Sequence, residues 1–282
     1  MLGLHFYNLN DPHSPEMCIL LTSDGLQMPV LPCANCATGP ESCNTGQKCK
    51  AAVITNGEAT PVFAEESMVV DLVTKEMDCY VDLNLLAIGG GGRSTSKGGA
   101  GSGYIETTTM RLATNNSTIK VTVGDCQESS TVEVGGTVVL DAKPGESTGS
   151  GLAGDGYSGG GGGGGNGTTG KGGLHGGDGE DTLIYRKFLP GGKGSGFDLG
   201  LITMKNFVLG PGEGGLPGDY HRSGGGGGVV VNGKKPGGIK YRGQGYGGGG
   251  SNEGGDVGYS GLVLIEVTRT VPIIVKIMNK IF

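Results

Sequence analysis

The chain has 282 residues, of which 63 are glycine and 35% are hydrophobic, and it carries a formal net charge of −6. This mild acidity argues against nonspecific nucleic-acid binding, which needs a basic surface. The length allows one or two domains, and no stretch is long and apolar enough to predict a transmembrane helix.

Residues 1–50 hold five of the seven cysteines and show little periodicity, which predicts an irregular N-terminal segment. Cysteines gathered in the first half of a glycine-rich chain favour disulfides, and hence an extracellular protein. A four-thiolate zinc site in this segment is the alternative, but the spacing of its second cysteine pair is loose. The odd count leaves at least one thiol free or paired outside the chain. The disulfide candidates are Cys18, Cys33, Cys36, Cys43, Cys49, Cys79 and Cys126.

The first ten residues have neither the basic region nor the apolar region of a signal peptide. We therefore expect the sequence to be a fragment of, or an imperfect gene model for, a secreted or cell-surface protein. Sequons for N-glycosylation, which add modest support to that location, place candidate acceptors at Asn115, Asn116 and Asn166.

Residues 51–144 are expected to be rich in β-strands. Residues 79–85 place Val81, Leu83 and Leu85 on one side and Tyr80, Asp82 and Asn84 on the other, which is typical of a half-buried strand. Residues 119–123 alternate in the same way. Residues 51–55 and 67–74 are β-branched runs, and residues 131–134 and 137–140 flank two glycines that predict a hairpin turn.

Residues 145–270 alternate glycine runs with strand-like segments at 182–185, 206–209 and 229–231. The nearly continuous β-forming run at 262–267 predicts a strand buried on both faces. Such a strand must pair with earlier strands, so we expect the glycine-rich part to belong to the same domain. Residues 271–282 form an apolar C-terminal tail. No amphipathic helix is predicted, so the fold class is all-β with little or no α-helix.

The glycine runs, above all residues 159–165, need an explanation because ordering glycine costs more backbone entropy than ordering any other residue. One hypothesis is that the runs form extended helices of the polyproline II type, with three residues per turn, which pack against each other. Buried N–H and C=O groups would then bond between neighbouring runs. The alternative is a set of flexible linkers.

Chemical motifs are few. Residues 176–184 match a calcium-binding nonapeptide once, with Asp178, Glu180 and Asp181 as candidate ligands, but we favour a solvated acidic turn. The glycine runs lack the following helix that a phosphate-binding loop needs. The four histidines are widely spaced and suggest no catalytic set. We therefore expect neither enzymatic activity nor a cofactor.

Two groups of motifs together resemble a known extracellular domain. The first group lies at 86–92, 101–105 and 119–124, and the second at 224–233, 245–250 and 261–266. Their order is similar to that of the glycine-rich domain of the anaplastic lymphoma kinase and leukocyte tyrosine kinase receptors. It also resembles invertebrate secreted glycine-rich proteins and, more distantly, glycine-rich adhesins of phage tail fibres. The resemblance covers roughly residues 80–268. It implies a β-sandwich or jelly-roll-like frame with packed polyglycine helices, but no kinase domain follows, so no catalysis is carried over.

The favoured hypothesis is a non-enzymatic extracellular recognition or adhesion module, monomeric or a disulfide-linked oligomer, that binds a protein or glycan. Its non-glycine turns would present the contacts, although ordinary solvated loops are the alternative interpretation. The rival hypothesis is a structural protein of the extracellular matrix or cuticle that has no specific ligand. The candidate partner contacts are Tyr185, Phe188, Tyr220, Arg222, Tyr241 and Arg242.

Overall fold

The computed structural model describes most of the strand-forming and glycine-rich parts of the chain. Apart from the turns between strands, the largest stretches outside the description lie near the two ends and around residues 159–193. The described residues are 18–21, 27–30, 48–55, 58–59, 61–74, 79–94, 98–113, 118–147, 153–158, 173, 177–179, 182–184, 187–189, 194–216, 223–236, 241–251 and 257–272.

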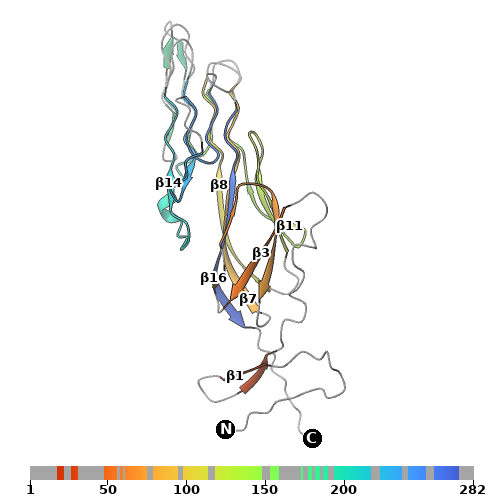
Figure 1. Ribbon diagram of the computed structural model, residues 1–282. Helices are drawn as coiled ribbons and strands as arrows, with labels where there is room; N and C mark the ends of the chain where they lie inside the picture. Colours follow the sequence, from red (N-terminus) through yellow and green to blue (C-terminus); the bar gives the residue numbers. More distant parts are fainter. Residues whose placement is uncertain are drawn as a thin grey trace.

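A six-stranded sheet is built from the first half of the chain (Figure 1). All its neighbouring strands are antiparallel except β3 and β6, which run parallel. In order across the sheet the strands are β11 (Thr137–Ala142), β10 (Ser130–Val134), β9 (Thr118–Thr122), β6 (Met68–Thr74), β3 (Lys48–Thr55) and β4 (Glu58–Ala59). The strands predicted at 51–55, 67–74 and 119–123 are thus confirmed to within a few residues.

The turn between β10 and β11 has the chemistry that its two glycines predict. Gly135 has φ +57° and Gly136 has φ +83°, and no atom lies within 4 Å of a Cβ built at either position. Backbone conformation, and not lack of space, therefore selects glycine here. Two successive residues with positive φ give the turn that matches the twist of paired strands, so the predicted hairpin is confirmed.

A four-stranded sheet combines early and late parts of the chain. Its order is β5 (Val62–Ala64), β16 (Leu262–Pro272), β7 (Cys79–Ile88) and β8 (Ile105–Ala113), all antiparallel. The alternation predicted for β7 is confirmed, because Val81, Leu83 and Leu85 are buried while Tyr80 is 43% exposed. The sequence patterns predict neither β5 nor β8.

One cluster of buried side chains receives residues from both sheets. The six-stranded sheet contributes Val70, Ile119 and Val132, and the four-stranded sheet contributes Leu83 and Ile265, among others. Each of these side chains is at most 2% exposed. Burial of these apolar side chains stabilises the contact between the sheets. We call the two sheets together with this cluster the two-sheet body.

The strand predicted to be buried on both faces is β16. Val263 and Ile265 enter the cluster of the two-sheet body. Leu262 and Leu264 enter a second cluster on the opposite face, with Tyr157 and several residues of the glycine-rich part. This confirms the prediction from residues 262–267 and ties the two halves of the chain together.

Shorter elements complete the described fold. The strand pairs are β1 (Cys18–Leu21) with β2 (Gln27–Val30), β12 (Thr182–Ile184) with β13 (Lys187–Leu189), and β14 (Leu209–Pro211) with β15 (Val229–Val231). The segment expected to be irregular, residues 1–50, thus contains a short hairpin. A strand predicted at 206–209 is wrong apart from its last residue, because Asn206 bonds instead to a buried carboxylate described below.

The described chain is all-β, and its helical content is one short turn, η2 (Leu199–Leu201). Within the part of the chain that the structure describes, no helix has the length and hydropathy needed to cross a membrane.

Glycine-rich segments continue from one end of the two-sheet body as extended, roughly parallel lines (Figure 1). Nearly all their glycines are buried, and hydrogen bonds between main-chain groups join one run to another. A Cβ atom at Gly90 would lie 1.8 Å from the carbonyl oxygen of Asp125, and one at Gly243 would lie 1.8 Å from that of Gly226. We call these segments the glycine body; they span 89–94, 98–104, 143–147, 153–158, 212–216, 223–228, 241–251 and 257–261. The longest run, 159–165, lies outside the described residues.

In two runs of the glycine body the hydrogen-bond partners repeat every three residues. In the run 223–228, the N–H groups of Gly225 and Gly228 both donate to the run 241–251, while the two N–H groups between them donate to two other segments. In the run 98–104, Ala100 and Gly103 donate to one neighbouring run, and Gly101 and Tyr104 donate to another. A β-strand, whose residues alternate in direction, would repeat every two residues.

Candidate functional site

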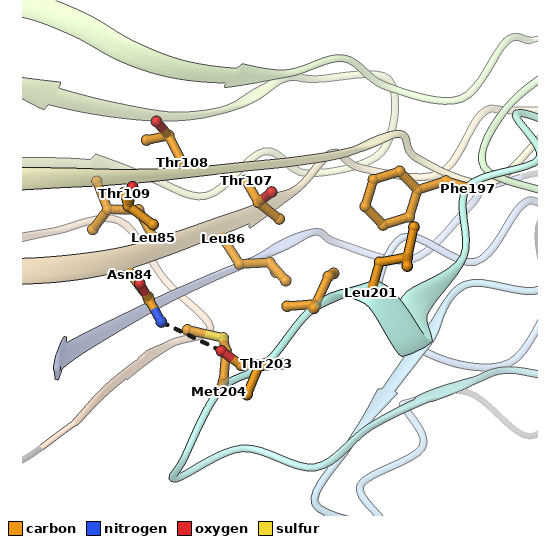
Figure 2. A pocket seen from close by; sticks show the side chains of 11 residues that line it. Asn84, Leu85, Leu86, Thr107, Thr108, Thr109, Phe197, Leu201, Thr203 and Met204 are labelled. Carbon is orange, nitrogen blue, oxygen red and sulfur yellow. Dashed lines mark hydrogen bonds between the residues drawn. The ribbon is translucent and has the colours of Figure 1, made fainter.

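A cleft of about 430 Å³ lies on the outer face of the four-stranded sheet, under the segment 197–204 (Figure 2). Pairing of β7 with β8 sets Asn84 opposite Thr109 and Leu86 opposite Thr107. Directly opposed residues point to the same face, so these four side chains form the sheet side of the cleft.

The chemistry of this face changes along the two strands. Next to Asn84 and Thr109, Asp82 lies opposite Arg111, and the Arg111 Nε lies 2.6 Å from Asp82 Oδ1. This hydrogen bond with Arg111 lowers the pKa of Asp82. At the other end Leu86 is buried in the second cluster. The face thus runs from charged through uncharged polar to apolar, and the cleft covers the last two parts.

The segment 197–204 forms the opposite side of the cleft. It contains η2, which is capped by Asp198: the Gly200 N–H donates to the carboxylate at 2.8 Å. Such capping satisfies a donor that the turn leaves without a backbone partner. Phe197, Leu201 and Met204 then face the sheet (Figure 2). Leu201 is 80% exposed although it lines the cleft.

Side-chain hydrogen bonds fix this segment to the sheet. Asn84 Nδ2 donates to the carbonyl oxygen of Thr203 at 3.3 Å (Figure 2). Glu266 of β16, only 1% exposed, accepts from the backbone N–H groups of Lys205 and Asn206 at 3.0 Å and 2.6 Å. It also accepts from Asn206 Nδ2 at 2.8 Å. A buried carboxylate is tolerated when donors satisfy it, so the core strand holds the rim of the cleft in place.

A second group of contacts joins β5 to the glycine body. The Tyr246 hydroxyl donates to Glu65 Oε1 at 2.6 Å, and Lys234 Nζ lies 3.5 Å from Glu65 Oε2. Lys234 also lies 4.6 Å from the centre of the Phe63 ring, which meets the Tyr246 ring edge-on. Burial, with the Glu65 contact, raises the pKa of Tyr246. We call Phe63, Glu65, Lys234 and Tyr246 the Tyr246 clasp.

The sequence-predicted site residues do not line the cleft where they are described. Arg242 lies over the ring of Tyr259, 5.6 Å from its centre, and Tyr241 accepts a backbone hydrogen bond from Gly225. Asp178 accepts a hydrogen bond from the Gly194 N–H at 2.7 Å. Among the described residues no group of three or more His, Cys, Asp or Glu side chains could hold a metal ion.

Cys126, predicted as a disulfide candidate, is a free thiol in the structure. It accepts a hydrogen bond from the Gly258 N–H at 3.2 Å, and burial raises its pKa. Cys18, Cys49 and Cys79 lie in strands, but their side chains are outside the description. The other predicted residues whose contacts fall outside the description are Cys33, Cys36, Cys43, Asn115, Asn116, Asn166, Glu180, Asp181, Tyr185, Phe188, Tyr220 and Arg222.

The cleft is not predicted by the sequence patterns described above. Two signals in the chain could have pointed to it. Residues 107–109 are three successive threonines in a glycine-rich chain. Threonine is β-branched, and β-branched residues favour strands. Residues 197–204 are a largely apolar segment between glycine runs. Neither signal tells that the two segments meet, because they lie about ninety residues apart in the sequence.

Comparisons with known proteins assign no family to this fold or cleft. No family model, no curated protein and no solved structure matches the chain.

Proposed function

We propose that this chain is a non-enzymatic extracellular recognition or adhesion module that binds a protein or glycan partner. The observation that carries the proposal is the cleft between β7–β8 and residues 197–204, whose rim is fixed by hydrogen bonds to the buried Glu266. A concave, preformed and mostly apolar site with a few polar groups is typical of a ligand-binding pocket.

The side chains that line the cleft support binding over catalysis. They are leucine, isoleucine, methionine, phenylalanine, threonine and asparagine. General acid–base catalysis needs a group that exchanges protons near neutral pH, and none of these side chains does so. Their chemistry suits hydrogen bonding and apolar contact with a partner.

The proposal includes the architecture that the family resemblance implies. We propose that the two-sheet body is a β-sandwich, which the cluster shared by both sheets supports. We propose that runs 98–104 and 223–228 of the glycine body are polyglycine helices with three residues per turn, which their three-residue hydrogen-bond repeat supports. Such a body would be a rigid mount for the segment that borders the cleft.

The extracellular location rests on the sequence. The N-terminal cysteines and the three sequons are its support. Secretion from a eukaryotic host, followed by mass-spectrometric mapping of disulfides and glycans, tests it. Failure of the protein to be secreted, together with reduced cysteines throughout the protein recovered from the cells, would contradict this location.

A matched pair of substitutions tests the recognition function. Leu201 lines the cleft and is 80% exposed, whereas Val208 is 75% exposed and does not line it. Wild type, Leu201→Glu and Val208→Glu are applied to a glycan array and to intact cells of several types. We expect wild type and Val208→Glu to bind the same surfaces and Leu201→Glu to bind at least tenfold more weakly, with unchanged thermal midpoints.

Two results would contradict recognition by the cleft. One is the absence of binding by wild type to every glycan and cell. The other is equal binding by the two variants. The rival, a matrix protein without a ligand, predicts the first result together with a broad, non-cooperative thermal transition by circular dichroism.

A further inference from the structure

Building on the proposed recognition function, we infer that the cleft binds an uncharged, mainly aliphatic segment of an extended peptide. One apolar side chain enters between Leu86 and the segment 197–204, and the peptide main chain lies along Thr107 and Thr109. The inference names the class of partner that the proposed function leaves open.

The uncharged lining of the cleft disfavours an ionic ligand group. The side chains that line it carry no formal charge, and Asp82 and Arg111, just beyond it, are already paired with each other. An inserted carboxylate or ammonium would lose part of its hydration and find no charged partner among the lining side chains, which is unfavourable. The preferred ligand group is therefore neutral.

The apolar side of the cleft fits an aliphatic side chain. Leu86, Leu201, Ile202 and Met204 are aliphatic or thioether side chains, and Phe197 supplies the aromatic ring. The volume of about 430 Å³ falls in the range of small-ligand pockets. Unbranched methionine adapts to ligands of varied shape, so the pocket accepts more than one apolar side chain.

The edge strand beside the cleft favours a peptide over a sugar. β8 is an edge strand, with β7 as its hydrogen-bonded neighbour in the described sheet. An extended peptide can add to such an edge through its main chain while alternate side chains enter neighbouring pockets. The Thr107 and Thr109 hydroxyls can each donate and accept, so they can bond polar groups of a peptide whose main chain runs beside this edge.

Methyl-resolved NMR of the full chain tests the inference. The methyl groups of Leu201, Ile202 and Met204 line the cleft and report occupancy directly. The probes are N-acetyl-Val-Leu-Val-amide, its central-glutamate analogue N-acetyl-Val-Glu-Val-amide, and maltotriose. We expect saturable shifts of these methyl signals with the neutral peptide, with a Kd on the order of 1 mM, and at least tenfold weaker binding of the glutamate peptide.

Variants locate the binding. Leu201→Glu should abolish the shifts of the Ile202 and Met204 methyl signals, and the exposed Val208→Glu should leave the affinity unchanged. Thr107→Val and Thr109→Val should each weaken binding by about threefold to tenfold, the effect of one lost hydrogen bond.

The outcomes separate the ligand class from the function. Shifts caused by maltotriose but not by either peptide would overturn the peptide class while supporting recognition of a glycan. Equal binding of the neutral and glutamate peptides, or no effect of either threonine substitution, would overturn the proposed mode of binding. No response to any probe at 20-fold above the expected Kd would overturn the inference, and the array and cell assays decide the proposed function independently.

Discussion

The two-sheet body is held together by contacts between side chains, whereas the glycine body is held together by hydrogen bonds between main-chain groups. In the two-sheet body, side chains such as Leu83 and Ile265 are buried in a shared cluster. In the glycine body, main-chain N–H and C=O groups of separate runs bond directly to one another. The first region depends on the size of its side chains, and the second depends on having none.

This difference changes what each region tolerates. A core made of side chains loses contacts when one is shortened, and the neighbours relax only partly. In the glycine body, an added methyl group at most positions would meet a carbonyl oxygen at about 2 Å, far inside van der Waals contact. Because that oxygen belongs to a main chain that is hydrogen-bonded to other runs, it cannot shift without disturbing those hydrogen bonds.

The sharpest test of the comparison adds one carbon atom to the glycine body. A Cβ at Gly225 would lie 2.1 Å from the carbonyl oxygen of Gly249. We expect Gly225→Ala to lower the free energy of unfolding by more than about 4 kcal/mol, a size reserved for exceptional substitutions. Chemical denaturation followed by circular dichroism measures it.

Gly210 supplies the matched control. No atom lies within 4 Å of a Cβ built there, although the residue is part of strand β14. Gly210→Ala should be neutral, or stabilising by up to about 1 kcal/mol because it restricts the unfolded chain. Equal stability of the two alanine variants would refute the close packing of the glycine body.

The corresponding test in the two-sheet body removes carbon atoms. Leu83 is fully buried in the shared cluster. Leu83→Ala should cost about 3 kcal/mol, since lost transfer free energy and the remaining cavity both contribute. Denaturant titration measures this cost. The control is Leu201→Ala, at an 80% exposed position, which should change the free energy of unfolding much less. A cost below about 1 kcal/mol for Leu83→Ala would mean that the two sheets are not closely packed.

The two regions also differ in how far the sequence predicts them. Period-two alternation located β7, and two glycines between β-branched runs located the β10–β11 hairpin. Both signals are local. The continuous run at 262–267 predicted burial on both faces of β16, which the two clusters confirm.

Other features depend on contacts that the local pattern does not encode. β5 has three residues, and its pairing with β16 spans about two hundred positions. Asn206 lies in a strand-like run, yet Glu266 draws its backbone into a bend. The cleft needs both β8 and residues 197–204, so neither segment alone predicts it. Glycine runs raised the hypothesis of packed backbone, but which runs are neighbours follows from the fold.

Alkaline pH probes the face where the two regions meet. Tyr157 is 1% exposed, and burial, with a smaller contribution from Asp198, raises its pKa to about 12. The folded state therefore favours the neutral phenol. The contribution of Tyr157 to the free energy of unfolding is fully present below the unfolded pKa of about 10 and is lost as pH rises from about 10 to 12.

This loss should reach about 2 kcal/mol for Tyr157, from the size of the pKa shift. Urea titrations at several pH values between 9 and 12 measure it for wild type and for Tyr157→Phe. Tyr246, whose pKa is also raised, contributes to the wild-type loss and remains in the variant. An identical pH dependence for the two proteins would show that the Tyr157 ring is solvated, and that the second cluster does not close over it.

The smallest expected effect concerns the Tyr246 clasp, which connects the two regions. Tyr246→Phe keeps the ring packed edge-on against Phe63 and removes the hydroxyl that donates to Glu65 at 2.6 Å. Because Glu65 is half-exposed and solvent screens the contact, we expect a cost of about 1 kcal/mol, below the usual range for a hydrogen bond to a charged group. A double-mutant cycle with Glu65→Gln isolates the contact, and additivity of the two substitutions would show that it contributes nothing.

Amide hydrogen exchange of Tyr246→Phe tests whether the clasp couples the two regions. If it does, the substitution speeds exchange in the run 223–228 as well as in β5, whereas faster exchange in β5 alone would show a local effect.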